Sequence, residues 1–297
     1  MMKIILIFVI LLSLTGFNQA EPVKVVIMYT NNTNGVLENC HCPSHPYGAL
    51  EKRAVIIERV RKREKNVLLL DTGDISDIAM NTLRHTYVLK AYQYMKYDAW
   101  TAGDQDFVEG MDFFRENYLS LDMSLVNINI TYKDQLLGDK YIIKQFDNIK
   151  IGITGIIDSD FQKYIYSDAK KYIKIIDQDN ALTNVLSELK DQCDYIILLS
   201  HSGIDRDHSI AGQHPGINLI IGGHSQTLTK VPEKVNDTYI VQAGENGFRI
   251  GTLSLIFENK KCSSINNQVL LLKENAPDQP EIMKLIEEYK KKLKEKK

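Results

Sequence analysis

Apolar runs rich in β-branched residues alternate with amphipathic segments along most of this chain. Four of the runs lead into a short polar turn that carries an acidic residue or a histidine beside glycine or serine. The runs and their turns are 67–70 before Asp71-Thr72-Gly73-Asp74, 99–101 before Ala102-Gly103-Asp104, 195–199 before Ser200-His201, and 217–221 before Gly222-Gly223-His224-Ser225-Gln226. Buried strands that end in this way present polar side chains at the carboxyl edge of an α/β sheet. The pattern therefore predicts one site assembled from four distant segments.

The order of the other segments predicts an α/β fold in which two sheets pack face to face, with helices on both outer faces. Further apolar runs predict strands at 23–29, 123–128, 141–144, 149–156, 239–242, 250–257 and 268–272. Helical periodicity predicts helices at 49–63, 82–95, 111–118, 180–189 and 280–297. Because no Pro-, Gly- or Ser-rich linker interrupts this order, we expect a single domain over residues 21–297. Its core would occupy 23–257, and a C-terminal strand and charged helix would occupy 258–297.

The first 20 residues have the pattern of a cleaved secretory signal peptide. Lys3 precedes an apolar stretch at 4–14, and residues 15–20 lead from there to a small residue, Ala20, at the exit. The stretch is shorter than the ~20 apolar residues that span a bilayer comfortably. We therefore expect an exported protein, periplasmic or extracellular, without a stable membrane span after cleavage. A retained membrane anchor is the alternative.

Net charge and cysteine content bear on the possible partners, the disulfides and a further metal site. The formal net charge of −2 gives no electrostatic argument for a nucleic-acid polymer as partner. The four cysteines, which fit an exported protein with zero to two disulfides of undetermined pairing, are Cys40, Cys42, Cys193 and Cys262. The Cys40-His41-Cys42 triplet also allows a separate soft-metal site. Alternatively, its thiolates could join a rebuilt metal centre near Asn32 and Asn34.

Several motifs, taken in order, resemble the calcineurin-like metallophosphoesterase superfamily, and specifically the catalytic domain of exported 5′-nucleotidases. The resemblance runs from about residue 23 to residue 257. It is carried by Thr30-Asn31-Asn32-Thr33-Asn34-Gly35, Gly48-Ala49-Leu50, Gly73-Asp74, Gly103-Asp104-Gln105-Asp106, Ser200-His201 and Gly222-Gly223-His224-Ser225-Gln226. The resemblance implies the two-sheet fold predicted above and a site that binds two metal ions.

The resemblance assigns two sets of metal ligands, with position 74 shared between them. The set at positions 74, 104, 201 and 224 is Asp74, Asp104, His201 and His224, two carboxylates and two imidazoles that suit Zn, Mn or Fe. The other set reads Asn32, Asn34, Asp74 and Gln226, where the family has a carboxylate and two imidazoles in place of the three amides. Neutral amide oxygens are weak ligands for a transition metal, although they can serve Ca²⁺ or Mg²⁺. We expect one good metal site and one doubtful site.

The catalytic positions implied by the resemblance have also changed. Gln105 stands where the family has a histidine that stabilises the departing oxygen, and Val108 replaces the aspartate that assists it. Glutamine can donate a hydrogen bond but cannot transfer a proton. We expect Gln105, Asp104 and His201 to carry whatever catalysis remains.

The sequence thus predicts a weak phosphoester hydrolase for small phosphorylated substrates with good leaving groups. The alternative is a catalytically degenerate member that binds a metal, an anion or a protein partner of unknown identity. After residue 257 only a short segment remains, so we expect no separate C-terminal nucleotide-binding domain. We expect the Tyr and Phe residues to pack in the core rather than to form a platform for a base.

Overall fold

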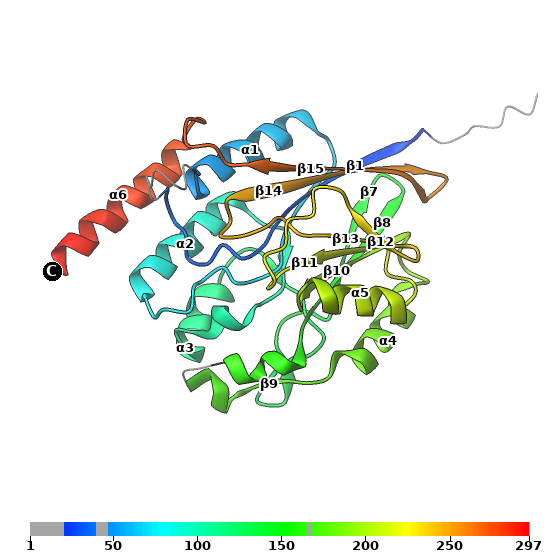
Figure 1. The fold of residues 1–297 in the computed structure, drawn as a ribbon, viewed down its shortest axis with the longest axis horizontal. Coiled ribbons are helices and arrows are strands. Elements are labelled where there is room, and N and C mark those ends of the chain that lie inside the picture. The colour runs from blue at the N-terminus through cyan, green and yellow to red at the C-terminus, as the bar shows by residue number, and fades with distance from the viewer. Residues whose placement is uncertain (1–20, 40–46, 166–167, 297) are drawn as a thin grey trace, which may run out of the picture.

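A computed structural model describes residues 21–39, 47–165 and 168–296, and it contains two six-stranded sheets that face each other (Figure 1). The first sheet has the order β15-β14-β1-β2-β3-β4. Its strands are β1 (Val23–Thr30), β2 (Val67–Asp71), β3 (Ala99–Trp100), β4 (Ser124–Leu125), β14 (Arg249–Glu258) and β15 (Lys261–Leu271). The strands from β1 to β4 are parallel, and β14 and β15 add an antiparallel edge.

The second sheet has the order β12-β13-β11-β10-β8-β7. Its strands are β7 (Tyr141–Phe146), β8 (Ile149–Ile157), β10 (Tyr195–His201), β11 (Leu219–Gly222), β12 (Glu233–Val235) and β13 (Thr238–Val241). The four central strands are parallel, and β7 and β12 pair antiparallel at the two edges. A small third sheet combines β5 (Ile130–Tyr132), β6 (Gln135–Leu136) and β9 (Ile173–Ile175).

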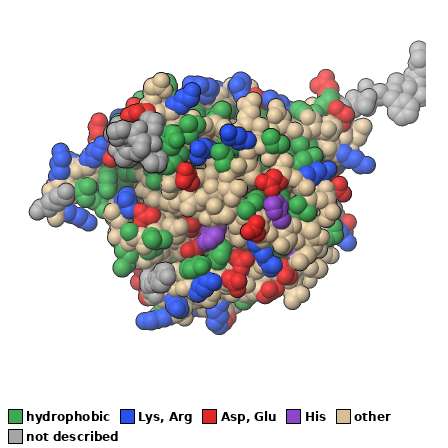
Figure 2. Space-filling view, in the orientation of Figure 1, with side chains coloured by type: hydrophobic (Ala, Val, Ile, Leu, Met, Phe, Trp, Pro, Cys, Tyr) green, Lys and Arg blue, Asp and Glu red, His purple; other side chains and the backbone are tan. Residues whose placement is uncertain are grey.

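Helices cover the outer faces of both sheets (Figure 1). The α-helices are α1 (Leu50–Arg63), α2 (Thr82–Met95), α3 (Met111–Phe113), α4 (Gln178–Leu189), α5 (Ile204–Gln213) and α6 (Pro280–Glu295), and a π-helical turn, Phe114–Tyr118, continues α3. Short 3₁₀ helices occupy Asp104–Phe107, Ser159–Tyr164 and Asp168–Lys171. Helix α6 packs against α1 and α2 through Ile282 and Ile286, and its lysine-rich remainder is largely exposed, as the blue side chains around its end show in Figure 2.

The buried apolar residues form three layers, as a helix–sheet–sheet–helix sandwich requires. Alternate residues of β1 separate two of the layers. Val25 and Ile27 lie in the core between the sheets, whereas Val26 and Met28 face the helices of the first sheet. The predicted α/β sandwich with helices on both outer faces is therefore confirmed.

The parallel strands of both sheets end at the same edge of the sandwich. The turns after β1, β2 and β3 of the first sheet and after β8, β10 and β11 of the second meet there. The four turns after apolar runs that the sequence singled out therefore reach a single location, as the carboxyl-edge rule predicts.

Two predicted strands differ from the structure, and one helix has no counterpart among the predictions. The strand expected at 123–128 is only Ser124–Leu125, because the Asn127 side chain accepts hydrogen bonds from the backbone N–H groups of Asn129 and Ile130 and turns the chain into β5. The strand expected at 268–272 is the end of the much longer β15, which forms a hairpin with β14 through a turn at Asn259 and Lys260. Helix α5 follows β10 directly and was not predicted.

Two sequence predictions fall outside the described residues. They are the signal peptide at 1–20 and the Cys40-His41-Cys42 triplet. Cys193 and Cys262 are both described, and both are free thiols. None of the helices within the described ranges combines the length and the apolar character that crossing a membrane demands.

Candidate metal centre

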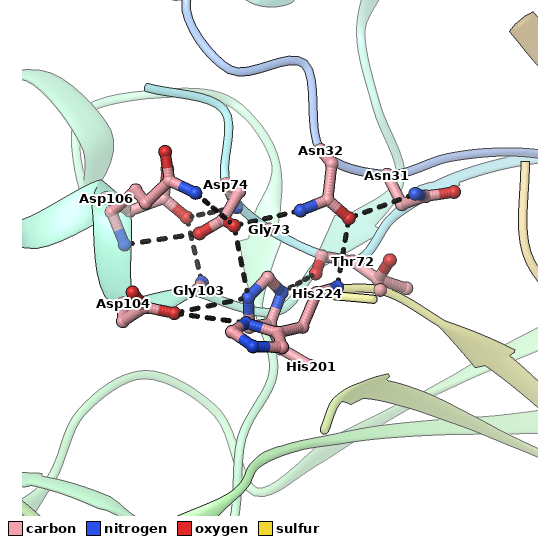
Figure 3. Close-up of polar contacts among 12 residues, drawn as sticks. Asn31, Asn32, Thr72, Gly73, Asp74, Gly103, Asp104, Asp106, His201 and His224 are labelled. Carbon is pink, nitrogen blue, oxygen red and sulfur yellow. Dashed lines mark hydrogen bonds and ion pairs between the residues drawn. The ribbon is translucent and has the colours of Figure 1, made fainter. Parts of the chain in front are cut away.

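Four side chains that are far apart in the sequence meet at the carboxyl edge of the sandwich (Figure 3): Asp74, Asp104, His201 and His224. One ligand atom from each lies within 4.8 Å of the other three. In the part of the chain that the structure describes, no other group of three or more His, Cys, Asp or Glu side chains converges in this way. The structure thus brings together the four residues predicted as the strong site, and their metal binding stays a prediction.

Each sheet contributes half of this set. Asp74 and Asp104 follow β2 and β3 of the first sheet, whereas His201 ends β10 and His224 follows β11 of the second. The turns can approach one another because glycines line them. A Cβ atom on Gly103 would collide with the Asp74 carboxylate and would lie 2.7 Å from Cε1 of His201.

The loops that carry the candidate ligands have an uncommon backbone conformation. Five of the seven predicted positions are non-glycine residues with positive φ: Asn32 (46°), Asn34 (50°), Asp74 (54°), His224 (65°) and Gln226 (55°). Asn, Asp and His tolerate this left-handed region better than most residues, but it is strained for all of them. Such strain gathers at functional sites, where the surrounding structure enforces it.

The hydrogen bond of His201 with the backbone fixes the orientation of its ring. Its Nδ1 lies 2.6 Å from the carbonyl oxygen of Thr72 and donates to it. The opposite ring atom, Nε2, therefore faces the carboxylates of Asp74 and Asp104, at 3.3 and 3.5 Å. Burial alone would lower the pKa of His201, but the two carboxylates outweigh burial and hold this pKa well above its ordinary value.

The inward-facing atoms of the cluster have poor hydrogen-bond partners within the chain. Oδ1 of Asp104, Nε2 of His201 and Nδ1 of His224 are buried and lack a well-placed hydrogen-bond partner. Asp104 Oδ1 lies 3.5 Å from each imidazole nitrogen, and the contact of His201 Nε2 with Asp74 Oδ2 is 3.3 Å long. Burial tends to raise the pKa of Asp104, but the two histidines outweigh it and lower this pKa below its usual range. Buried polar atoms aimed at a common point are typical of the ligands of a transition-metal site. The residues present fit one ion.

The doubtful second set is less suited to a transition metal. The Asn32 amide donates to Oδ2 of Asp74 at 2.9 Å, and its own oxygen accepts the backbone N–H of His224 at 2.9 Å. The Asn34 amide donates to Gln226 at 3.3 Å. The Asn32 N–H group thus already binds Oδ2 of Asp74, the residue that the two predicted ligand sets share. Ca²⁺ or Mg²⁺ at this position stays a prediction.

Gln105 is also directed at the same carboxylate. Its side-chain amide donates to Asp74 Oδ2 at 2.7 Å, and its backbone N–H donates to Asp74 Oδ1 at 3.2 Å. Val108, at the position where the family has the assisting aspartate, is buried and apolar. Asp74 therefore accepts N–H groups from two neutral amides, and no group at these two positions can supply a proton.

Asp106 holds the two turns that carry Asp74 and Asp104 in place. The sequence analysis did not identify this role. Its carboxylate accepts the backbone N–H groups of Gly103, Asp74, Ile75 and Ser76 and the hydroxyl of Tyr118. Burial and the neighbouring Asp74 raise the pKa of Asp106 to about 7 despite these donors. Asp106 is a positioning residue, because it fixes the backbone from Asp74 to Ser76 and the backbone N–H of Gly103, directly before Asp104.

Two aromatic residues beside the cluster were also missed. Phe161 stacks on the His224 ring, with centroids 3.9 Å apart and planes 28° apart, and Tyr164 lies farther out. Both belong to the 3₁₀ helix Ser159–Tyr164, which follows the carboxyl end of β8. The position of this segment directly after a parallel strand could have indicated that it lies near the site. Its residues belong to no motif of the resemblance, so the signal was not used.

Asp207 of α5 contacts the end of β10, the strand that ends at His201. Ser200 donates its hydroxyl to Oδ1 of Asp207 at 2.5 Å, and the carboxyl group is fully buried. Burial raises the pKa of Asp207 from 3.8 to about 8, and the Ser200 hydrogen bond offsets only part of the shift. Burial therefore favours the protonated form of Asp207 in the folded chain.

Asp207→Asn is expected to weaken the pH dependence of stability between pH 4 and 8. In that window the folded chain keeps a proton that the unfolded chain has released, so wild-type stability falls as the pH rises, by up to about 1.4 kcal/mol per pH unit. Asparagine imitates the protonated acid and removes this contribution. Urea unfolding at pH 5, 6, 7 and 8 measures it, with the exposed Asp205→Asn on the same helix as control. Parallel curves for wild type and Asp207→Asn would contradict the assignment.

Comparison with known proteins identifies relatives of this chain. The family model for calcineurin-like phosphoesterases matches residues 40–227. The trifunctional nucleotide phosphoesterase YfkN of Bacillus subtilis is 26% identical over 91% of this chain and 21% of its own length. The venom 5′-nucleotidase of Crotalus adamanteus is 26% identical over 88% of this chain and 50% of its own length. The chain thus spans about half, or less, of these curated relatives.

A solved structure agrees at the level of the fold. The 5′-nucleotidase precursor of Thermus thermophilus superposes with a TM-score of 0.79 at 22% identity, covering 91% of this chain and 59% of that one. The family match includes the turns that carry all four members of the metal cluster and extends over more than half of the sequence. This chain belongs to the calcineurin-like phosphoesterase family.

Proposed function

We propose that this chain is a phosphoester hydrolase that works with one divalent metal ion, held by Asp74, Asp104, His201 and His224. The convergence of these four side chains, with inward-facing atoms that lack good partners, is the observation that carries the proposal. Zn, Mn or Fe suits this mixed nitrogen and oxygen donor set. The chemistry that such an ion supplies is Lewis acidity toward a phosphoryl oxygen and a lower pKa for an attacking water.

The chain's own residues restrict which substrates it can hydrolyse. Gln105 cannot protonate a leaving group, and a missing positioned acid costs about 10²–10⁴-fold in rate. Substrates whose leaving group departs as a stable anion avoid this loss. We therefore propose aryl phosphates or phosphoanhydrides as substrates and slow turnover of alkyl phosphates. Nucleotides enter as candidates only through the names of the relatives, and single-domain organisation over residues 21–297 stays a prediction.

We also propose that the chain is exported. The basic, apolar and then small-residue pattern of residues 1–20 supports this, as does the resemblance to proteins named as venom 5′-nucleotidases. Detection of the mature chain outside the cytoplasm, beginning near Glu21, tests the proposal. A mature protein that retains residues 1–20 in a membrane fraction would support the membrane-anchor alternative.

Metal content and hydrolysis together test the enzymatic proposal. Protein stripped with a chelator and reloaded with Mn²⁺ or Zn²⁺ is expected to bind one ion per chain and to hydrolyse an aryl phosphate. His224→Ala is expected to lose both properties. His208→Ala is the matched control and should retain both, because His208 lies on α5, outside the cluster, and pairs with Glu233. Equal hydrolysis by wild type and His224→Ala would contradict the proposal.

The second candidate is a non-catalytic member that binds a metal, an anion or a protein partner. The observation that favours it is the pair of amides, from Asn32 and Gln105, on the Asp74 carboxylate. One bound ion without any hydrolysis of aryl phosphates or anhydrides would support this reading, and clear metal-dependent turnover would exclude it.

A further inference from the structure

An aromatic surface borders the metal cluster on its histidine side. It consists of Phe161 and Tyr164 from the 3₁₀ helix Ser159–Tyr164, and we call it the aromatic shelf. Phe161 stacks directly on His224, and the Tyr164 ring lies 6.5 Å from the His224 ring with only 23° between their planes. Phe161 also meets the His201 ring edge-on at 6.3 Å. The shelf therefore lies against the rings of two metal-ligand candidates, His201 and His224, with Tyr164 at its outer end.

The shelf is held in place from both ends. Asp158 caps the short helix by accepting the backbone N–H of Asp160, and its own backbone N–H donates to the carbonyl oxygen of His201. Gln162 accepts the backbone N–H of Ile175 at 2.7 Å, which fastens the segment to β9. These two contacts, one from the Asp158 backbone and one from the Gln162 side chain, tie the segment to β10 and β9 and set its position beside the cluster.

The outer part of the shelf is open to a ligand. Tyr164 is 39% exposed, and Lys163 places its ammonium group 5.0 Å from the centroid of the Tyr164 ring. An exposed ring next to a cation, close to the cluster that would hold a phosphoryl group, matches the two halves of an aromatic phosphoester. Aromatic rings stack on one another with a gain beyond the apolar area that they bury.

We infer that the aromatic shelf is a binding subsite for the leaving group of an aryl phosphate monoester, with the ring of the ester packed against Tyr164. The inference rests on the proposed function and names its substrate class. A second argument agrees with it. A phenol ionises near the pKa of tyrosine, about 10, so an aryl oxide can leave without the acid that Gln105 does not provide.

The reaction balances without a proton donor in the site. The oxygen of a water molecule forms a new bond to phosphorus, and the bond between phosphorus and the aryl oxygen breaks. The aryl oxygen leaves with the electron pair as a phenolate, and the proton of the water passes to solvent. The shelf contributes by orienting the departing ring and by covering its apolar surface.

Tyr164→Ala tests the shelf through substrate discrimination. The ratio of kcat/KM for phenyl phosphate to kcat/KM for pyrophosphate is expected to fall by about threefold to tenfold, mostly through KM for phenyl phosphate. Tyr164→Phe should restore the ratio because it keeps the ring. Tyr172→Ala is the matched control, since Tyr172 is 40% exposed and packs instead beside Tyr132. A Tyr164→Ala ratio equal to that of wild type would overturn the inference.

Binding without turnover separates this inference from the proposed function. Calorimetry on metal-loaded protein should show phenylphosphonate binding more tightly than methylphosphonate, and Tyr164→Ala should remove the preference. If that preference exists but no substrate is hydrolysed, the subsite stands and the hydrolase proposal fails. If phenyl phosphate is hydrolysed while both phosphonates bind equally, the subsite fails alone. Faster hydrolysis of adenosine 5′-monophosphate than of phenyl phosphate would overturn the aryl assignment.

Discussion

Turnover of an alkyl phosphate is expected to rise by about 10²–10⁴-fold when four amide side chains at the site are replaced together. The changes are Asn32→Asp, Asn34→His, Gln105→His and Gln226→His. The first, second and fourth supply the carboxylate and imidazoles that a second ion lacks, and the third supplies a side chain that can move a proton. Elemental analysis should show two ions per chain instead of one.

The structure gives reasons to expect the backbone to accept these changes. Asn32, Asn34 and Gln226 already have positive φ, and Asp and His are among the residues that tolerate this region. Asn32→Asp removes the amide that now donates to Asp74 and places two carboxylates close together. A second cation would relieve that repulsion, so the gain should require added metal.

A triple variant that keeps Gln105 separates the two causes. It should bind two ions yet remain slow on alkyl phosphates, because it still lacks the acid. Asn236→Asp, at an exposed turn with φ of 52°, controls for a change from Asn to Asp in a left-handed conformation. Rapid alkyl phosphate hydrolysis by the unmodified protein would show that the four amides do not limit it.

Asp106→Ala is expected to lower the free energy of unfolding by about 3–4 kcal/mol, the largest stability effect of the substitutions considered. The change removes an acceptor shared by five donors: the Tyr118 hydroxyl and the backbone N–H groups of Gly103, Asp74, Ile75 and Ser76. Each buried donor left without a partner costs about 1–3 kcal/mol, and relaxation of the loop recovers part of the total. Metal affinity should fall as well, because both turns lose their shared anchor.

Urea unfolding of the metal-free and metal-loaded forms measures this effect. Asp106→Asn should be less destabilising, since its amide oxygen can still accept some of the same N–H groups. Asp112→Ala, at an exposed acid on α3, is the control and should change stability little. A loss below about 1 kcal/mol for Asp106→Ala would mean that the turns hold their shape without the carboxylate.

The sequence was sufficient to predict the sandwich and the location of the cluster. Apolar runs mark the strands, and the carboxyl ends of parallel strands gather at one edge, so His201 and Asp74 could be placed together without coordinates. The meeting of all four side chains follows from this rule together with the family resemblance. That they bind metal is a chemical inference that the fold makes reasonable and does not itself test.

Other features depend on side-chain contacts that no periodicity reveals. The turn at Asn127 arises from one amide that accepts two backbone N–H groups, and it ends a strand that the apolar pattern would have continued. The orientation of Asn32 toward Asp74 depends on the His224 backbone, which is 192 residues away in the sequence. The aromatic shelf is stacked on His224 by tertiary packing, so Phe161 could not be distinguished from an ordinary core residue.

The division of the cluster between the two sheets has a mechanical consequence. Asp74 and Asp104 follow strands of one sheet, and His201 and His224 belong to the other. An ion held by all four would therefore cross-link the two sheets of the sandwich. Ligand binding to the native state adds stability that grows with ligand concentration, about 2.7 kcal/mol at one hundred times the dissociation constant. Metal scarcity in the surroundings would therefore loosen the junction of the two layers as well as slow the chemistry.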